Sequence, residues 1–162
     1  MNKILIALVV VLVGVGLIWF ARPQAQTSDL LVASTPGSLS ATETVFDFGN
    51  ISMAAGKVSH QFAVKNSGVG VVTINKIYTS CMCTSAKLIT ENGSFGPFGM
   101  VGHGFIPSIN RALLPGESAK VDVVFDPAAH GPAGVGKIER MVTIENDAGE
   151  LVELRFSAVV TP

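Results

Sequence analysis

Residues 140–160, RMVTIENDAGELVELRFSAVV, contain the pattern that decides the fold. Apolar and polar side chains alternate between Val152 and Val160, as expected of a strand with one buried face and one solvated face. A second alternating run, residues 140–145, precedes it, and the turn-forming sequence Asn146-Asp147-Ala148-Gly149 separates the two. We therefore predict a β-hairpin in this part of the chain.

The same pattern recurs toward the N-terminus, where short alternating runs occupy residues 45–49, 58–64, 71–79 and 121–125. Turn sequences such as Asn66-Ser67-Gly68 and Leu114-Pro115-Gly116-Glu117 separate these runs. No segment beyond residue 30 shows a helical period. About seven short strands with turns between them predict an all-β protein, an immunoglobulin-like antiparallel β-sandwich over residues 42–162.

The N-terminus has a different composition. Residues 4–20 are apolar and uncharged, and such a run is longer than the apolar region of most cleaved signal peptides. We therefore expect residues 1–23 to hold one transmembrane helix, with a cleaved signal peptide as the alternative. Lys3 lies before the run and Arg22 after it, which weakly favours a cytoplasmic N-terminus and a periplasmic or extracellular C-terminal domain. Residues 24–41 are rich in Ser, Thr, Gln, Pro and Gly and are expected to form a flexible linker.

The charge of the chain argues against nucleic-acid binding. Its formal net charge is -1, and its 11 basic and 12 acidic residues are scattered along the sequence.

Neither a phosphate-binding glycine loop followed by Lys nor a G-x-S-x-G nucleophile motif occurs. We therefore expect a non-enzymatic protein, with a thiol oxidoreductase as the alternative.

Cys81-Met82-Cys83 is the sharpest chemical feature of the sequence. If it ends a strand, the two Cα atoms lie roughly 6.5–7 Å apart, at or beyond the usual limit for a disulfide, so a bond between them would require a bend. Close thiols suit a soft metal ion or exchange with a partner thiol. The third interpretation is structural, with both cysteines capping a strand. Thiol oxidoreductase chemistry needs a thiolate-stabilising group, and neither a nearby Lys nor a helix N-terminus provides one.

Two histidines in glycine-rich loops could complete a metal site. Cys81 and Cys83 with His103 and His130 would make a tetrahedral set for Zn, and Met100 in place of one imidazole would favour Cu. The spacing matches no standard metal motif.

A long glycine-rich insertion lies near residues 90–113 and is unusually apolar. Its large side chains either fold back over the sandwich core or expose a patch for an envelope protein partner. The candidate partner-binding residues are Phe95, Phe98, Met100 and Phe105.

An ordered series of motifs resembles a known bacterial family. The series consists of Phe46-Asp47-Phe48-Gly49-Asn50-Ile51, Phe62-Ala63-Val64-Lys65-Asn66-Ser67-Gly68, Thr79-Ser80-Cys81-Met82-Cys83-Thr84, Leu114-Pro115-Gly116-Glu117 and Val121-Asp122-Val123-Val124-Phe125-Asp126. From Thr42 to Val160 the chain is similar to the family of domain of unknown function 1573, related to major-sperm-protein and Hydin-type immunoglobulin-like domains. The resemblance implies an exported β-sandwich, often tethered to the envelope, without an established activity. The insertion at residues 93–104 departs from the family pattern.

Together these features predict a membrane-anchored, exported β-sandwich, attached through residues 4–20, that binds envelope proteins or acts as a scaffold. The alternative is a protein that handles copper, zinc or thiols through Cys81-Met82-Cys83.

Overall fold

The computed structural model describes residue 2 and residues 37–162. These residues form strands and two short 3-10 helices, η1 (Met53–Ala55) and η2 (Gly131–Gly134). The strands are β1 (Leu39–Ala41), β2 (Val45–Ser52), β3 (Val58–Asn66), β4 (Val72–Thr79), β5 (Thr84–Thr90), β6 (Gly93–Phe98), β7 (Arg111–Leu113), β8 (Ser118–Phe125), β9 (Gly136–Asn146) and β10 (Val152–Thr161). Strand β1 occupies the last three residues of the predicted linker.

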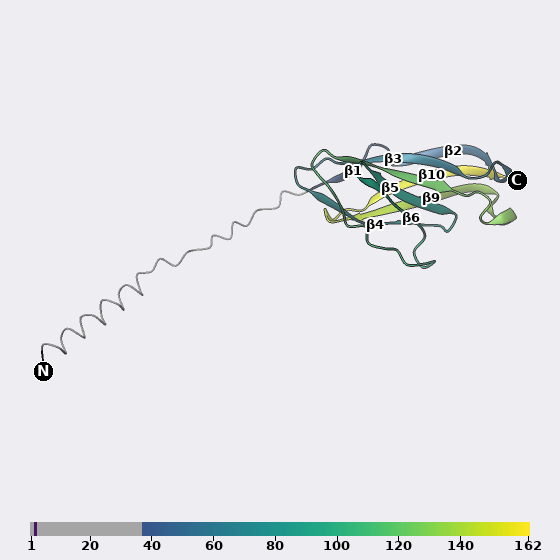
Figure 1. Ribbon diagram of the computed structural model, residues 1–162. Coiled ribbons are helices and arrows are strands. Elements are labelled where there is room, and N and C mark those ends of the chain that lie inside the picture. Colours follow the sequence, from purple (N-terminus) through teal and green to yellow (C-terminus); the bar gives the residue numbers. More distant parts are fainter. Residues whose placement is uncertain (1, 3–36) are drawn as a thin grey trace. The chain divides into compact units, whose positions relative to one another are not determined.

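The strands form two five-stranded sheets that pack face to face (Figure 1). One sheet has the order β1-β3-β8-β5-β6, and the other has the order β2-β10-β9-β4-β7. The predicted hairpin is confirmed, because β9 and β10 pair antiparallel with Val152 opposite Ile144. The chain crosses between sheets after β4, at the cysteine motif, and this crossing places both cysteines at one end of the sandwich.

The core lies between the sheets and is made by the inward-facing residue of each alternating pair. Phe62 of β3 and Phe156 of β10 are 0% and 1% exposed, and both are among the largest buried side chains. The rings of Phe125 and Phe156 lie 5.4 Å apart and join the two layers. Burial of side chains of this size stabilises the fold by about 1.5–3 kcal/mol each.

Two features of the sheets differ from the prediction. The described residues contain ten strands, not about seven, because β1 and β7 have three residues each and β6 contains two glycines, so these edge strands show little alternation. Strand β5 was not predicted for another reason. Its buried positions include Thr84 and Thr90, which are polar residue types, so the sequence shows no apolar alternation there. The sandwich is also not wholly antiparallel, since β2 and β10 pair in parallel.

The predicted fold class, which began with a transmembrane helix, is corrected as well. Within residue 2 and residues 37–162, no helix is long and apolar enough to cross a membrane. The two 3-10 helices have three and four residues, far below the roughly 20 apolar residues that a membrane span needs. The predicted span, residues 4–20, lies outside the described residues.

Candidate functional site

The cysteine motif forms a tight turn between β4 and β5. The backbone N–H of Thr84 donates to the Cys81 carbonyl at 3.1 Å, which closes the turn. The Cα atoms of Cys81 and Cys83 are therefore only 5.3 Å apart, and the two cysteines form a disulfide. The sequence indicated that a disulfide here would require a bend, and the chain does bend at this point as it changes sheets.

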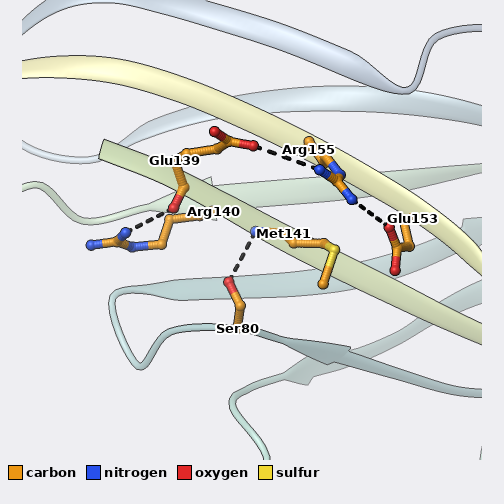
Figure 2. Close-up of polar contacts among 6 residues, drawn as sticks. All are labelled: Ser80, Glu139, Arg140, Met141, Glu153 and Arg155. Atoms are coloured by element: carbon orange, nitrogen blue, oxygen red, sulfur yellow. Dashed lines mark hydrogen bonds and ion pairs between the residues drawn. The ribbon is translucent and has the colours of Figure 1, made fainter. Parts of the chain in front are cut away.

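Hydrogen bonds from three strands hold this turn in place. The backbone N–H of Asp126, just after β8, donates to the Cys83 carbonyl at 2.8 Å, and the Thr79 hydroxyl donates to the Cys81 carbonyl at 2.9 Å. Figure 2 shows the link to β9, where the Met141 N–H donates to the Ser80 hydroxyl at 2.9 Å. The disulfide thus sits on a turn whose backbone is fixed on both sides.

One side of the disulfide faces an open pocket of about 530 Å³. Both cysteines are buried, but Cys81, which is 8% exposed, lines this pocket, whereas Cys83, which is 3% exposed, does not. The lining residues are Ser80, Cys81, Met82, Met100, His103, His130, Glu139 and Arg140. We call this hollow the cysteine pocket.

His130 approaches the disulfide from the turn that follows β8. Its Nε2 lies 3.2 Å from the Cys81 Sγ. The Asp126 carboxylate fixes the start of this turn by accepting from the Ala128 N–H at 3.0 Å, and the Gly131 N–H donates to the Ala128 carbonyl at 2.9 Å. His130 is exposed to solvent, and its ring nitrogen contacts the sulfur.

Arg140 approaches the other sulfur from β9. Its Nε donates to the Cys83 Sγ at 3.4 Å, and its Nη1 donates to the Glu139 carbonyl at 2.8 Å. Figure 2 shows this second contact beside a surface charge chain in which Glu139 pairs with Arg155 and Arg155 pairs with Glu153. Sequence reasoning missed Arg140. The residue lies 57 positions from Cys83, and only the pairing of β4 with β9 brings it to the cysteine turn.

The remaining predicted ligands also lie at the cysteine pocket. Thr79 pairs with Met100 through a parallel bridge, and the His103 N–H donates to the Met100 carbonyl at 3.3 Å. Met100 and His103 therefore both line the pocket. The tightest ligand group among the described residues is smaller: the ligand atoms of Cys81, Cys83 and His130 lie within 4.8 Å of one another.

The four predicted partner-binding residues have different surroundings. Phe98 is 5% exposed and belongs to the core, and Phe95 packs partly against it, with the Arg111 guanidinium 5.8 Å from the centre of its ring. Met100 lines the cysteine pocket, whereas Phe105 is 89% exposed and lines a second hollow that includes Tyr78. Residues 93–98 of the predicted insertion form β6, which pairs with β5.

Comparison with protein families identifies one match. The family described as "Protein of unknown function (DUF1573)" matches residues 39–108. The resemblance to this family is confirmed. The DUF1573 match includes the cysteine turn and the glycine-rich segment that carries Met100 and His103. It ends before the turn after β8, which supplies His130, and before β9, which supplies Arg140. No curated protein matches the chain.

Solved structures of low sequence identity resemble this chain. A protein of unknown function from Porphyromonas gingivalis W83 is 16% identical with a TM-score of 0.57, and the alignment covers 82% of this chain and 51% of that one. The VesB protease of Vibrio cholerae is 16% identical with a TM-score of 0.48, over 76% of this chain and 32% of that one. The PapD-like domain 7 of human CEP192 is 14% identical with a TM-score of 0.47, over 79% of this chain and 87% of that one. This chain thus spans about half the length of the Porphyromonas protein, and that likeness shows the fold alone.

Proposed function

We propose that this β-sandwich exchanges its Cys81–Cys83 disulfide with thiols of a partner protein. The observation that carries the proposal is the position of the disulfide at an open pocket, with His130 on one sulfur and Arg140 on the other. A disulfide that only stabilised the fold would need neither an opening to solvent nor a cation beside a sulfur.

The pocket determines which of the two sulfurs a partner thiolate attacks. Because Cys81 lines the pocket and Cys83 does not, a partner thiolate reaches the Cys81 Sγ first. A new sulfur–sulfur bond forms between the partner and Cys81, the Cys81–Cys83 bond breaks, and its electron pair leaves on Cys83 as a thiolate. The Arg140 guanidinium, 3.4 Å from that sulfur, stabilises the leaving charge.

A second partner thiolate completes the reaction. It attacks the partner sulfur bound to Cys81, so the partner gains an internal disulfide and Cys81 leaves as a thiolate. His130, whose Nε2 lies 3.2 Å from the Cys81 Sγ, is placed to hydrogen-bond this thiolate. The partner loses two electrons and the domain gains them; the same steps in reverse reoxidise the domain.

This role fits an exported domain. Disulfides persist in oxidising compartments such as the bacterial periplasm and the cell exterior. The partner would be an envelope protein whose thiol-bearing segment enters the cysteine pocket, which joins the predicted binding role to the predicted thiol chemistry.

The experiment compares the two single variants of the full chain with oxidised glutathione as the probe. In Cys83→Ser, the remaining Cys81 should form a mixed disulfide with glutathione rapidly. In Cys81→Ser, the remaining Cys83 should do so much more slowly, because it does not line the pocket. Mass spectrometry of samples quenched at increasing times measures both rates, and circular dichroism checks that both variants fold.

The wild-type disulfide supplies the second measurement. Dithiothreitol should reduce it in the folded protein, at denaturant concentrations well below the unfolding transition. If it opens only when the protein unfolds, or if the two single variants react at equal rates, the proposal is wrong.

A further inference from the structure

The cysteine pocket also holds a compact set of soft donors. The ligand atoms of Cys81, Cys83 and His130 lie within 4.8 Å of one another, a separation that a single ion can bridge. We propose that the reduced domain binds one Cu(I) ion through the two thiolates and the imidazole of His130. This inference rests on the proposed function in one respect, since the disulfide must open before the thiolates can act as ligands.

The fixed backbone of the cysteine turn favours this site. The hydrogen bonds to the carbonyls of Cys81 and Cys83 come from Thr84, Thr79 and Asp126, and none of them involves a sulfur atom. Reduction of the disulfide therefore leaves the two side chains next to each other. A ligand pair that is already in place loses little conformational freedom when the ion binds.

The donor types select the ion. Thiolate and thioether ligands favour Cu(I), and Met100 adds a thioether to the lining of the same pocket. Met82, between the two cysteines, is 57% exposed and offers a second thioether at the surface. A structural zinc site would instead need four protein ligands, and the group of Cys81, Cys83 and His130 supplies three.

Charge points the same way. Two thiolates and one Cu(I) ion carry a net charge of -1, whereas the same ligands around Zn²⁺ are neutral. Arg140 donates to the Cys83 Sγ at 3.4 Å and brings one positive charge to the site. The net charge of -1 on the Cu(I) site is therefore balanced by the positive charge of the Arg140 guanidinium.

Disulfide formation would switch the site off. Each sulfur in the oxidised form is bonded to the other and carries no negative charge, so two of the three ligands are lost together. Ion binding in turn protects the thiolates from attack at the pocket. The domain would thus hold either a disulfide or a Cu(I) ion.

The test uses the full chain, reduced with a phosphine and kept without oxygen. Cu(I) is titrated in the presence of a coloured Cu(I) chelator, and the loss of colour measures transfer to the protein. One equivalent should bind to the reduced chain and none to the oxidised chain. Removing a residue that only supports a ligand through a hydrogen bond weakens metal binding roughly 10–100-fold. Because His130 is itself a ligand, His130→Ala should weaken Cu(I) binding by more than this.

His60→Ala is the matched control, because His60 contacts Glu43 and the Phe46 ring instead of the cysteine pocket. It should leave Cu(I) binding unchanged. Equal affinity in wild type and His130→Ala, or a reduced chain that takes Zn²⁺ but not Cu(I), would overturn the inference. Because the phosphine opens the disulfide without a partner thiol, Cu(I) binding can succeed or fail independently of the glutathione experiment.

Discussion

The guanidinium of Arg140 is the residue-scale feature on which disulfide exchange depends most directly. Arg140→Gln removes the positive charge 3.4 Å from the Cys83 Sγ. A hydrogen bond to a charged group contributes about 1.5–3 kcal/mol, so we expect dithiothreitol to open the disulfide roughly 10-fold more slowly or slower still. The rate is followed by quenched alkylation and mass spectrometry. Arg155→Gln, which removes a guanidinium paired with Glu139 and Glu153, should leave the rate unchanged.

Tyr78 gives a prediction about alkaline pH. Burial raises the pKa of Tyr78 above its ordinary value of 10.0, and the neighbouring Glu145 carboxylate raises it further. The folded state therefore favours the neutral phenol, and this contribution to stability is lost as pH rises from 10.0 through the higher pKa of the folded state. Glu145→Gln should lower the pKa of Tyr78 toward the ordinary value.

The measurement is direct because Tyr78 is the single tyrosine of the chain. Ultraviolet absorbance of tyrosinate during an alkaline titration reports this residue alone. A titration curve that coincides with that of the denatured protein would contradict the prediction.

At the residue scale, the sequence indicated which side chains could act as ligands, but it did not indicate how they are arranged in space. Cys81, His130 and Met100 could be chosen from their chemistry, and all three line one pocket. The disulfide could not be predicted from strand geometry, because it depends on the bend that brings the Cα atoms to 5.3 Å. Arg140 resembles any charged residue on a strand face until the register of the neighbouring strands is known.

At the scale of elements, Asn66 fastens the end of β3 to three other segments. Its side-chain oxygen accepts from the N–H groups of Ser38 and Gly68, and its amide donates to the carbonyls of Gly70 and Leu113. The side chain is fully buried. Each buried group left without a partner costs about 1–3 kcal/mol.

We therefore expect Asn66→Ala to lower the free energy of unfolding by about 3 kcal/mol. Urea denaturation followed by circular dichroism measures the loss. Asn50→Ala, at an exposed position of β2, is the control and should change stability little. If the two variants lose equal stability, the hydrogen bonds of Asn66 do not hold the turn.

The Asn66-Ser67-Gly68 motif was recognised as a turn, and the structure supplies its reason. A Cβ atom on Gly68 would lie 2.5 Å from the Ser38 nitrogen and 2.7 Å from the Gly37 carbonyl carbon, so the chain before β1 could not approach. The long strands of the two sheets were visible in the sequence because their alternation is clean. Strands β1 and β7 were not, because three residues are too few to show a period.

For the whole molecule, stability depends on contact between the two sheets. Phe156 of β10 packs against Phe125 of β8 in the opposite sheet and against Phe48 of β2. Phe156→Ala should lower the free energy of unfolding by about 3–5 kcal/mol, because it removes a buried ring and leaves a cavity. Chemical denaturation gives the value. Val159→Ala, on the same strand but 40% exposed, should cost far less.

The sandwich class followed from the sequence, since alternation with a period of two residues gives each sheet one apolar face. The order of the strands did not, because alternation carries no information about which strand lies beside which. The parallel pairing of β2 with β10 joins segments about 110 residues apart, as in the contact of Ser157 with Asp47.

That pairing has a mechanical consequence. Val45 lies level with Arg155, and Ser52 lies level with Thr161, so β2 and β10 run side by side in the same direction. A pull on the start of β2 and the end of β10 acts along the two strands in opposite senses. It shears their hydrogen bonds together instead of opening them one at a time. The parallel pair of β2 and β10 therefore resists tension applied between the start of β2 and the end of β10.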